Sequence, residues 1–251
     1  MTDTIMTTKD LCKSYATDGV QNHVLKNIDF KLREGEFAVV MGSSGSGKST
    51  MLYCLSGMDT ATSGEIAYNG KSFGSMNEDK LAVLRRRDFG FVFQQMHLVA
   101  NLTVFENISV PGYLTSKPKA VHERAEELMH RVGISELSKR LPSQISGGEQ
   151  QRAAVARALI SSPRILFADE PTGSLNSKSG QEVLDMLTQF NKNGQTILMV
   201  THDIKAALRA TRLIYIKDGK LITEMDMGEY SEEQTQARES QVIAWLSSLG
   251  W

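Results

Sequence analysis

The stretch Gly42-Ser43-Ser44-Gly45-Ser46-Gly47-Lys48-Ser49 decides the fold. It matches the pattern G-x-x-x-x-G-K-[ST] at each fixed position, between an apolar run at Phe37–Met41 and a helical pattern over Lys48–Leu55. In isolation the stretch would be an ordinary Gly/Ser-rich loop, but the strand–loop–helix context favours a phosphate-binding P-loop. There, backbone N–H groups and the helix dipole face phosphate oxygens. The pattern predicts that Lys48 reaches the β- and γ-phosphates and that the Ser49 hydroxyl binds Mg²⁺.

Around the P-loop, short apolar runs alternate with helical patterns, which predicts an α/β fold with a mostly parallel sheet. The expected buried strands are Phe37–Met41, Gly90–Phe93, Ile165–Ala168 and Ile197–Val200. The expected helices next to them are Lys48–Leu55, Ser179–Asn191 and Ile204–Ala210. Between about residues 95 and 157 there is no strong strand, but there are helical stretches at Val104–Val110, Lys119–Val132 and Glu149–Ile160. This region is therefore expected to be an inserted all-helical subdomain.

The C-terminal part begins with an Asp218-Gly219 turn between Leu213–Ile216 and Leu221–Thr223, which predicts an antiparallel β edge. Residues 231–249 read as a helix that starts with a Ser231-x-x-Gln234 capping box. Two roles for this helix stay open: a cap over the sheet edge, or a dimer or regulatory contact. The predicted domains are residues 5–228, which would bind nucleotide, and a helical extension over residues 229–251.

Composition excludes several classes of protein. The 251 residues are 41% hydrophobic with a net charge of −1, which excludes disorder and a basic field for nucleic acid. Cys12 and Cys54 are too few for a disulfide framework and fit a reducing compartment. The N-terminus lacks the pattern of a signal peptide, and no apolar run approaches the roughly 20 residues that span a bilayer. We therefore expect a cytosolic protein.

Two further motifs complete a nucleotide site. The apolar run Ile165–Ala168 ends in Asp169 and Glu170, where Asp169 would hold the Mg²⁺ shell and Glu170 would deprotonate the attacking water. The stretch Ser146-Gly147-Gly148-Glu149 reads as a helix start with an S-x-x-E capping box. Its two glycines would leave the helix end bare, so that free N–H groups could meet a second face of ATP.

In these motifs and their order, the chain resembles the ATP-binding subunits of ABC transporters over nearly its whole length. The resemblance implies a head-to-tail pair of chains, with each ATP between one P-loop and the Ser146–Glu149 signature of the second copy. It also implies an integral membrane permease as partner, at the cytoplasmic face of the membrane. Four more roles follow from it: Tyr15 stacks on adenine, Thr50 contacts the α-phosphate, Gln94 senses the metal and the permease, and His202 contacts the γ-phosphate.

One position departs from the family pattern, because Asn176 stands where the family usually has an aspartate and so lacks its charge. The stretches Phe91–Gln94 and Leu102–Ile108 resemble the branch that serves macrolide export, lipoprotein release, cell division and peptide-antibiotic resistance. The segment Ile214–Gly219 and the C-terminal extension favour the bacitracin- and lantibiotic-resistance members. The rival class, a DNA-associated ATPase of the same family, would need a coiled-coil insert or zinc ligands, which the sequence lacks.

Overall fold

The structure is a computed structural model that describes residues 3–17 and 20–251. The chain divides into two compact units: unit 1 is Met1–Leu81 with Phe190–Trp251, and unit 2 is Ala82–Gln189. The two borders between the units fall inside helices α2 (Glu78–Asp88) and α6 (Ser177–Lys192).

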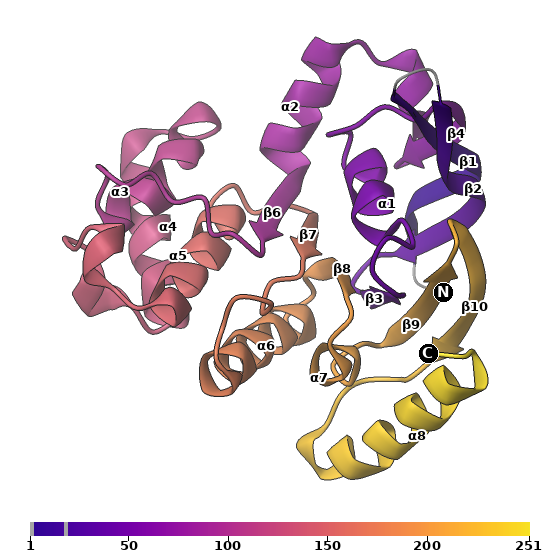
Figure 1. The fold of residues 1–251 in the computed structure, drawn as a ribbon. Helices are drawn as coiled ribbons and strands as arrows, with labels where there is room; N and C mark the ends of the chain where they lie inside the picture. Colours follow the sequence, from indigo (N-terminus) through magenta and orange to yellow (C-terminus); the bar gives the residue numbers. More distant parts are fainter. Residues whose placement is uncertain (1–2, 18–19) are drawn as a thin grey trace. The chain divides into compact units, whose positions relative to one another are not determined.

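Unit 1 contains a four-strand segment of mixed sheet in the order β10-β9-β3-β8 (Figure 1). Its strands are β3 (Phe37–Met41), β8 (Thr196–Thr201), β9 (Arg212–Lys217) and β10 (Lys220–Asp226). β3 is parallel to both β8 and β9, and each residue of β3 and β8 is buried. Such uninterrupted burial is typical of central parallel strands. β10 turns back antiparallel to β9 through Asp218 and Gly219, whose φ angles of 51° and 77° suit a tight hairpin.

A second, antiparallel sheet in unit 1 has the order β2-β1-β4-β5. Its strands are β1 (Thr4–Thr17), β2 (Val20–Arg33), β4 (Ser63–Tyr68) and β5 (Lys71–Ser72), followed by the 3₁₀ turn η1 (Phe73–Ser75). Helix α1 (Lys48–Leu55) contacts β8 of the first sheet and β2 of the second. The sequence pattern does not predict this sheet, because β-bulges along β1 interrupt the alternation of apolar residues.

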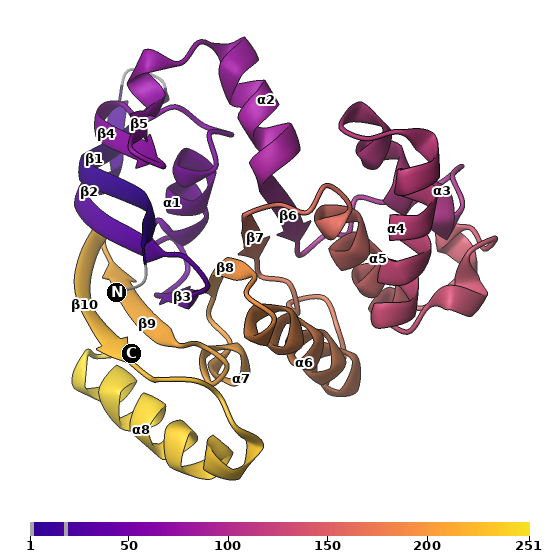
Figure 2. The ribbon, with the colours of Figure 1, turned by 180° about the vertical axis from the view of Figure 1, so that it is seen from behind.

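The C-terminal helix α8 (Thr235–Ser248) packs on unit 1 beside α7 (Ile204–Ala207) and β9 (Figure 2). Its side chains Val242 and Leu246 are buried, and the rings of Trp245 and Tyr215 meet edge to face with centroids 6.1 Å apart. Within unit 1, α8 thus covers α7 and the Tyr215 ring of β9, and its two expected roles, a cap over the sheet edge or a dimer or regulatory contact, stay predictions. The expected capping box is wrong: Ser231 makes no side-chain cap, residues Glu232–Gln234 form the 3₁₀ turn η5, and the helix begins only at Thr235.

Unit 2 pairs β6 (Phe89–Phe93) in parallel with β7 (Ile165–Asp169). Helix α5 packs against β6 and against the helices α3 and α4. The helical segments are α3 (Val104–Ser109), η2 (Val110–Leu114), α4 (Pro118–Arg131), η3 (Ser135–Leu137), η4 (Pro142–Gln144) and α5 (Gly147–Leu159). The prediction of an α/β fold with parallel strands, an antiparallel edge and an all-helical stretch is confirmed. The domain borders drawn from the sequence stay predictions.

The bounds predicted for three elements need correction. The helix expected over Ile204–Ala210 is α7, which ends at Ala207, and the hairpin strands β9 and β10 are longer than expected. Within the described residues, no helix combines the length and the apolar composition needed to cross a bilayer.

Candidate functional site

The P-loop leaves β3 at Met41 and enters α1 at Lys48, and two of its glycines are required by geometry. A Cβ atom on Gly42 would lie 2.3 Å from the carbonyl oxygen of Ile216 and 2.5 Å from Ser46 Oγ, so no side chain fits. Gly47 has a φ of 103° and is the N-cap of α1, which it leaves without a side-chain cap. The first turn of α1 also carries no acidic residue. The positive end of the helix dipole is therefore not neutralised by a side chain of its own first turn.

Two polar side chains of the P-loop lie buried around this helix end. Lys48 is 8% exposed, and its Nζ donates to the carbonyl oxygens of Gly42 at 2.6 Å and Ser43 at 3.0 Å. Ser46 is 3% exposed, and its Oγ has no hydrogen-bond partner in the described part of the chain. A buried hydroxyl without a partner is costly, so an anion that accepts from Ser46 would remove the penalty. The loop fits a polyphosphate.

His202 and Tyr15 lie in the same unit as the P-loop. Met41 pairs with Thr201 in the parallel register of β3 and β8, so Gly42 and His202 both follow the carboxyl ends of adjacent strands. That edge of a parallel sheet is where such folds bind ligands. The ring of Tyr15, on β1, is 41% exposed, and its hydroxyl donates to Asp59 Oδ2 at 2.6 Å. Unit 1 thus presents the predicted phosphate ligands with the predicted base-stacking ring.

The acidic residues and Gln94 lie together in unit 2. Phe93 of β6 pairs with Asp169 of β7, so Gln94 and Glu170 are the next residues beyond the two strands. Asp169 is 9% exposed and Glu170 is half-buried, with a φ of 47°. A positive φ is strained for a residue with a side chain and occurs often at functional sites.

The loop that follows Glu170 contacts both the backbone and the side chain of Gln94. Ser174 Oγ donates to the carbonyl oxygen of Gln94 at 2.9 Å, and a Cβ on Gly173 would lie 2.9 Å from Gln94 Nε2. Asn176, which departs from the family pattern, accepts from the N–H of Ser179 at 2.9 Å and so caps the start of α6. An aspartate or an asparagine serves equally as such a cap.

The signature Ser146–Glu149 begins α5 with a complete capping box. Ser146 Oγ accepts from the Glu149 N–H at 3.3 Å, and the Ser146 N–H donates to Glu149 Oε2 at 2.7 Å. The Ser146 N–H and the Ser146 hydroxyl, at 2.8 Å, both donate to Glu149 Oε2, and these two bonds lower the pKa of the Glu149 carboxyl below its ordinary value. The capping box expected from the sequence is therefore confirmed. The N–H groups of Gly147 and Gly148 still precede the first helical hydrogen bond, from Gln150 N to Ser146 O, and are the ones that could meet an anion.

The two signature glycines have different surroundings. A Cβ on Gly148 would lie 2.7 Å from Ser179 Oγ, so the close approach of α6 already explains that glycine. A Cβ on Gly147 would have its nearest neighbours at 3.8 and 3.9 Å, which is ordinary contact. Nothing within unit 2 therefore requires a glycine at position 147, which leaves room for a group from outside the chain.

The donor set predicted for the metal fits Mg²⁺. A hydroxyl from Ser49, a carboxylate from Asp169 and an amide oxygen from Gln94 are hard oxygen ligands of the kind that Mg²⁺ prefers. The described residues contain no cluster of three or more His, Cys, Asp or Glu side chains placed to hold an ion.

The sequence pattern did not predict a role for two residues near Tyr15, namely Asp59 and Lys13. Asp59 accepts the hydrogen bond of the Tyr15 hydroxyl, and Lys13 donates to Asp59. The spacing of Lys13 and Tyr15 on one strand, two residues apart, places them on the same face and was the available signal. For Asp59, in a turn 44 residues away from Tyr15, the sequence carries no such signal.

Comparisons with known proteins agree with the site. Residues 25–173 match the family described as "ABC transporter". An uncharacterised ABC transporter ATP-binding protein of Methanocaldococcus jannaschii, MJ1508, is 44% identical over 215 residues, which are 85% of this chain and 96% of that protein. The macrolide export ATP-binding/permease protein MacB of Marinobacter nauticus is 41% identical over 247 residues, which are 96% of this chain but only 38% of MacB.

Among solved structures, the ATP-binding cassette MJ0796, a dimer in a post-hydrolysis state bound to ADP and Pi, superposes with a TM-score of 0.82 and 36% identity. The match covers 90% of this chain and all of that one. The macrolide-export relative lies in the branch that the sequence motifs predicted. The chain belongs to the ABC transporter family, as one of its ATP-binding and ATP-hydrolysing cassettes with the P-loop NTPase fold.

Proposed function

We propose that the chain is the ATPase subunit of an ABC transporter, in which two copies close head to tail around two ATP molecules. Each ATP would lie between the P-loop of one copy and the Ser146–Glu149 signature of the other, and closure would drive a separate membrane permease at the cytoplasmic face of the membrane. The dimer of MJ0796 supports the pairing, and MacB, which joins a cassette and a permease by name, supports the partner.

The observation that carries ATP binding is the N-terminus of α1, where Gly47 provides no cap and Ser46 Oγ is buried without a partner. There Lys48 would exchange its two carbonyl partners for phosphate oxygens, and Thr50 would contact the α-phosphate. Tyr15 would stack on adenine, since an exposed aromatic ring binds a base through its face. Bound Mg²⁺, held by Ser49, Asp169 and Gln94, would neutralise phosphate charge.

For hydrolysis, Glu170 would accept the proton of the attacking water as general base, while His202 would donate a hydrogen bond to the γ-phosphate. The half-buried position of Glu170 next to the buried Asp169 supports this division of roles.

The test is Glu170→Gln, which keeps the size of the side chain but removes the base. ATP affinity should stay within about twofold, while turnover falls by about 10²- to 10⁴-fold. The variant should also accumulate as an ATP-bound dimer in size-exclusion chromatography. Glu229→Gln, the same change at an exposed acid, is the control and should leave both quantities unchanged. Normal turnover in Glu170→Gln would remove Glu170 from the catalytic role.

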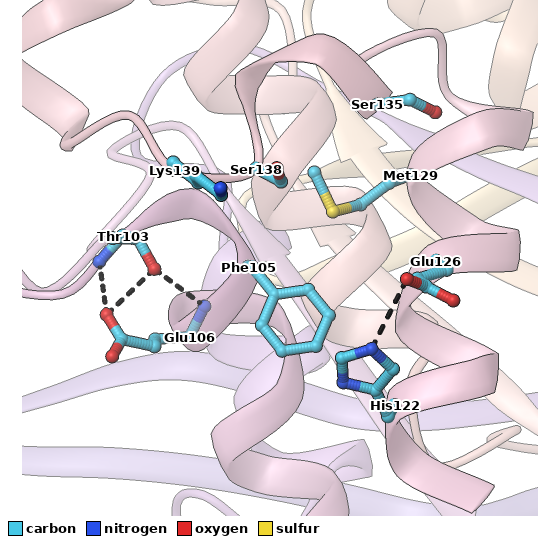
Figure 3. A pocket seen from close by; sticks show the side chains of 9 residues that line it. All are labelled: Thr103, Phe105, Glu106, His122, Glu126, Met129, Ser135, Ser138 and Lys139. Carbon is cyan, nitrogen blue, oxygen red and sulfur yellow. Dashed lines mark hydrogen bonds and ion pairs between the residues drawn. The ribbon is translucent and has the colours of Figure 1, made fainter. Parts of the chain in front are cut away.

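A groove on unit 2 fits the contact with the permease (Figure 3). It has a volume of about 490 Å³, and Phe105 and Met129 lie at its centre, between α3 and α4. Charged groups surround this apolar centre: Glu126 pairs with His122 at 3.2 Å, and Lys139 lies on the other side. In the same unit, five large apolar side chains are exposed, namely Val83, Val99, Val110, Tyr113 and Leu114. An apolar centre with a charged rim suits a short amphipathic helix, such as a cytoplasmic segment of a permease.

Charge reversal on α4 tests the groove. Glu126 lines it and pairs with His122, whereas Glu123, equally exposed on the same helix, pairs with Lys119 and does not line it. Glu126→Arg should weaken co-purification with the partner permease, while Glu123→Arg should not. The ATPase rate of the isolated cassette should be the same in both variants. Equal co-purification of the two variants would place the permease elsewhere.

For the substrate class, we propose resistance to peptide antibiotics, on the resemblance of Ile214–Gly219 and the C-terminal extension. Macrolide export is the second candidate, and the 41% identity to MacB favours it. Deleting the gene and measuring growth inhibition by bacitracin and by erythromycin separates the two, because only the true substrate should become more toxic.

A further inference from the structure

The exposed ring of Tyr15 is held by its hydroxyl, although the ring itself protrudes from β1. The hydroxyl donates to Asp59 Oδ2 at 2.6 Å. Burial of the hydroxyl and its bond to Asp59 raise the pKa of Tyr15 to about 12, so the group stays a neutral donor. The exposed part of the side chain, 41% of it, is therefore a ring whose position is fixed at the hydroxyl.

The partner of the hydroxyl, Asp59, lies in the turn that follows α1. The N–H of Asp59 donates to the carbonyl oxygen of Tyr53, in the last turns of that helix, at 3.1 Å. The hydroxyl of Tyr15 thus ties β1 to the C-terminal end of the helix that starts at the P-loop.

Lys13 completes the support. It lies two residues before Tyr15 on β1, and its Nζ binds Asp59 Oδ1 and donates to the carbonyl oxygen of Thr60 at 2.7 Å. The same ammonium lies 4.7 Å from the centroid of the Tyr15 ring. Asp59 accepts from Lys13, from Tyr15 and from the N–H of Thr60, and these bonds outweigh burial and lower the pKa of its carboxyl. Asp59 therefore stays charged and is the group that joins the ring to its supports.

We infer that Asp59 is a positioning residue for nucleotide binding: it fixes the Tyr15 ring, through the hydroxyl and with Lys13 beside it, at the place where the ring stacks on the adenine of ATP. The inference rests on the proposed role of Tyr15. Asp59 itself touches no nucleotide. A ring fixed in advance loses no rotamer freedom on binding, whereas a ring without its anchor must be ordered by the ligand.

Binding of ATP and of inorganic triphosphate, each with Mg²⁺, tests the inference by calorimetry. Asp59→Ala and Tyr15→Phe should each weaken ATP binding about fivefold, which corresponds to ordering one side chain. Both variants should leave the affinity for triphosphate unchanged, because the P-loop is intact. Lys9→Ala, a change at an exposed residue of the same strand, is the control and should alter nothing.

The double variant Asp59→Ala/Tyr15→Phe separates positioning from an independent effect. If Asp59 acts through the hydroxyl, the double variant should bind ATP no more weakly than either single variant. Additive losses, or a loss of triphosphate binding in Asp59→Ala, would overturn the inference.

Tyr15→Ala distinguishes failure of the inference from failure of the role of Tyr15. A large loss of ATP affinity in Tyr15→Ala with none in Asp59→Ala and Tyr15→Phe would keep the stacking role and overturn the positioning role. No loss in Tyr15→Ala would overturn both.

Discussion

Helices α1 and α5 both begin after glycine-containing stretches that the sequence assigns to ATP, yet their first turns are built differently. At α1 the N-cap is Gly47, with no side-chain cap and no acidic residue in the first turn. At α5 the N-cap is Ser146, and Glu149 closes a reciprocal capping box with it. No side chain of the first turn neutralises the positive end of the α1 dipole. At α5 the Glu149 carboxylate and the capping box already neutralise part of it.

The polar groups at the start of α1 need a ligand to complete their hydrogen bonds, whereas those at the start of α5 are mostly satisfied within the chain. Around α1, the buried Lys48 turns back to backbone carbonyls and Ser46 Oγ has no partner, so ATP would complete a site that is unfinished without it. Around α5, the capping box is satisfied, and only the N–H groups of Gly147 and Gly148 precede the helical bonds. The end of α5 therefore suits a second, weaker contact made after ATP is bound elsewhere.

Removing the charge at α1 should have the largest effect. Lys48→Ala deletes the one cation in the first turn of that helix and should weaken ATP binding by about 100-fold or more, since hydrogen bonds to charged groups contribute about 1.5–3 kcal/mol each. Fluorescent-nucleotide titration measures the loss. The thermal unfolding of the nucleotide-free variant, compared with the wild type, controls for folding. Retained affinity would mean that the α1 end is not the primary phosphate site.

Much of this architecture could be predicted from sequence because the central strands are short, apolar and bounded by turns. The β3 and β8 runs are buried at each residue, and that pattern does not depend on distant contacts. The antiparallel sheet was missed for the opposite reason: β1 shifts register between Thr8 and Leu11 and again before Lys13, which breaks the period of two. The late start of α8 also needed the structure, because Ser231 has the right type for a cap but makes no capping bond.

The candidate site was predicted where a motif has a fixed spacing, and missed where contacts join distant segments. The P-loop carries its own pattern, so its residues could be named in advance. Asp59 reaches Tyr15 across 44 positions, and Gly148 meets Ser179 across two helices, and no local pattern encodes either contact. Asn176 shows a further limit, because its capping bond to Ser179 is visible only in the folded chain.

The two signature glycines give the next test, because their surroundings predict opposite effects on stability. Gly148→Ala places a methyl group 2.7 Å from Ser179 Oγ and should lower the free energy of unfolding by about 1–3 kcal/mol. Gly147→Ala meets no atom closer than 3.8 Å and should leave stability unchanged or raise it by about 0.4–1 kcal/mol. Urea unfolding measures both.

For ATP-dependent dimerisation we expect the reverse order: Gly147→Ala should have the larger effect of the two variants. Gly147→Ala should retain ATP binding but lose ATP-dependent dimerisation in analytical ultracentrifugation, because the added methyl group occupies the space left for the second copy. If Gly147→Ala dimerises normally, the open space at position 147 has another cause, and the α5 end loses its role as the second contact.

Removing the cap itself should have a smaller effect on stability. Ser146→Ala should cost about 1 kcal/mol of unfolding free energy, the usual value for an N-cap. Thr103→Ala, at the matching capping box of α3, should cost a similar amount. Of the two, only Ser146→Ala should weaken ATP-dependent dimerisation. Equal dimerisation of the two variants would reduce the α5 cap to a purely structural feature.

The smallest expected effect is a pH-dependent contribution of Glu149 to stability. The start of α1 has no such contribution, because its first turn has no acidic residue. Hydrogen bonds from the Ser146 N–H and hydroxyl lower the pKa of Glu149 below its ordinary value of 4.5. A lowered pKa in the folded state means that the carboxylate stabilises the fold above about pH 4.5, and that this contribution is lost as the pH falls through the folded-state pKa. Glu149→Gln keeps a residue that can close the box, without the titration. Urea unfolding between about pH 7 and pH 3 should therefore show the wild type more stable than Glu149→Gln at neutral pH, with the difference shrinking towards pH 3. A difference that stays constant over this range would mean that the carboxylate of Glu149 makes no charge-dependent contribution to the cap.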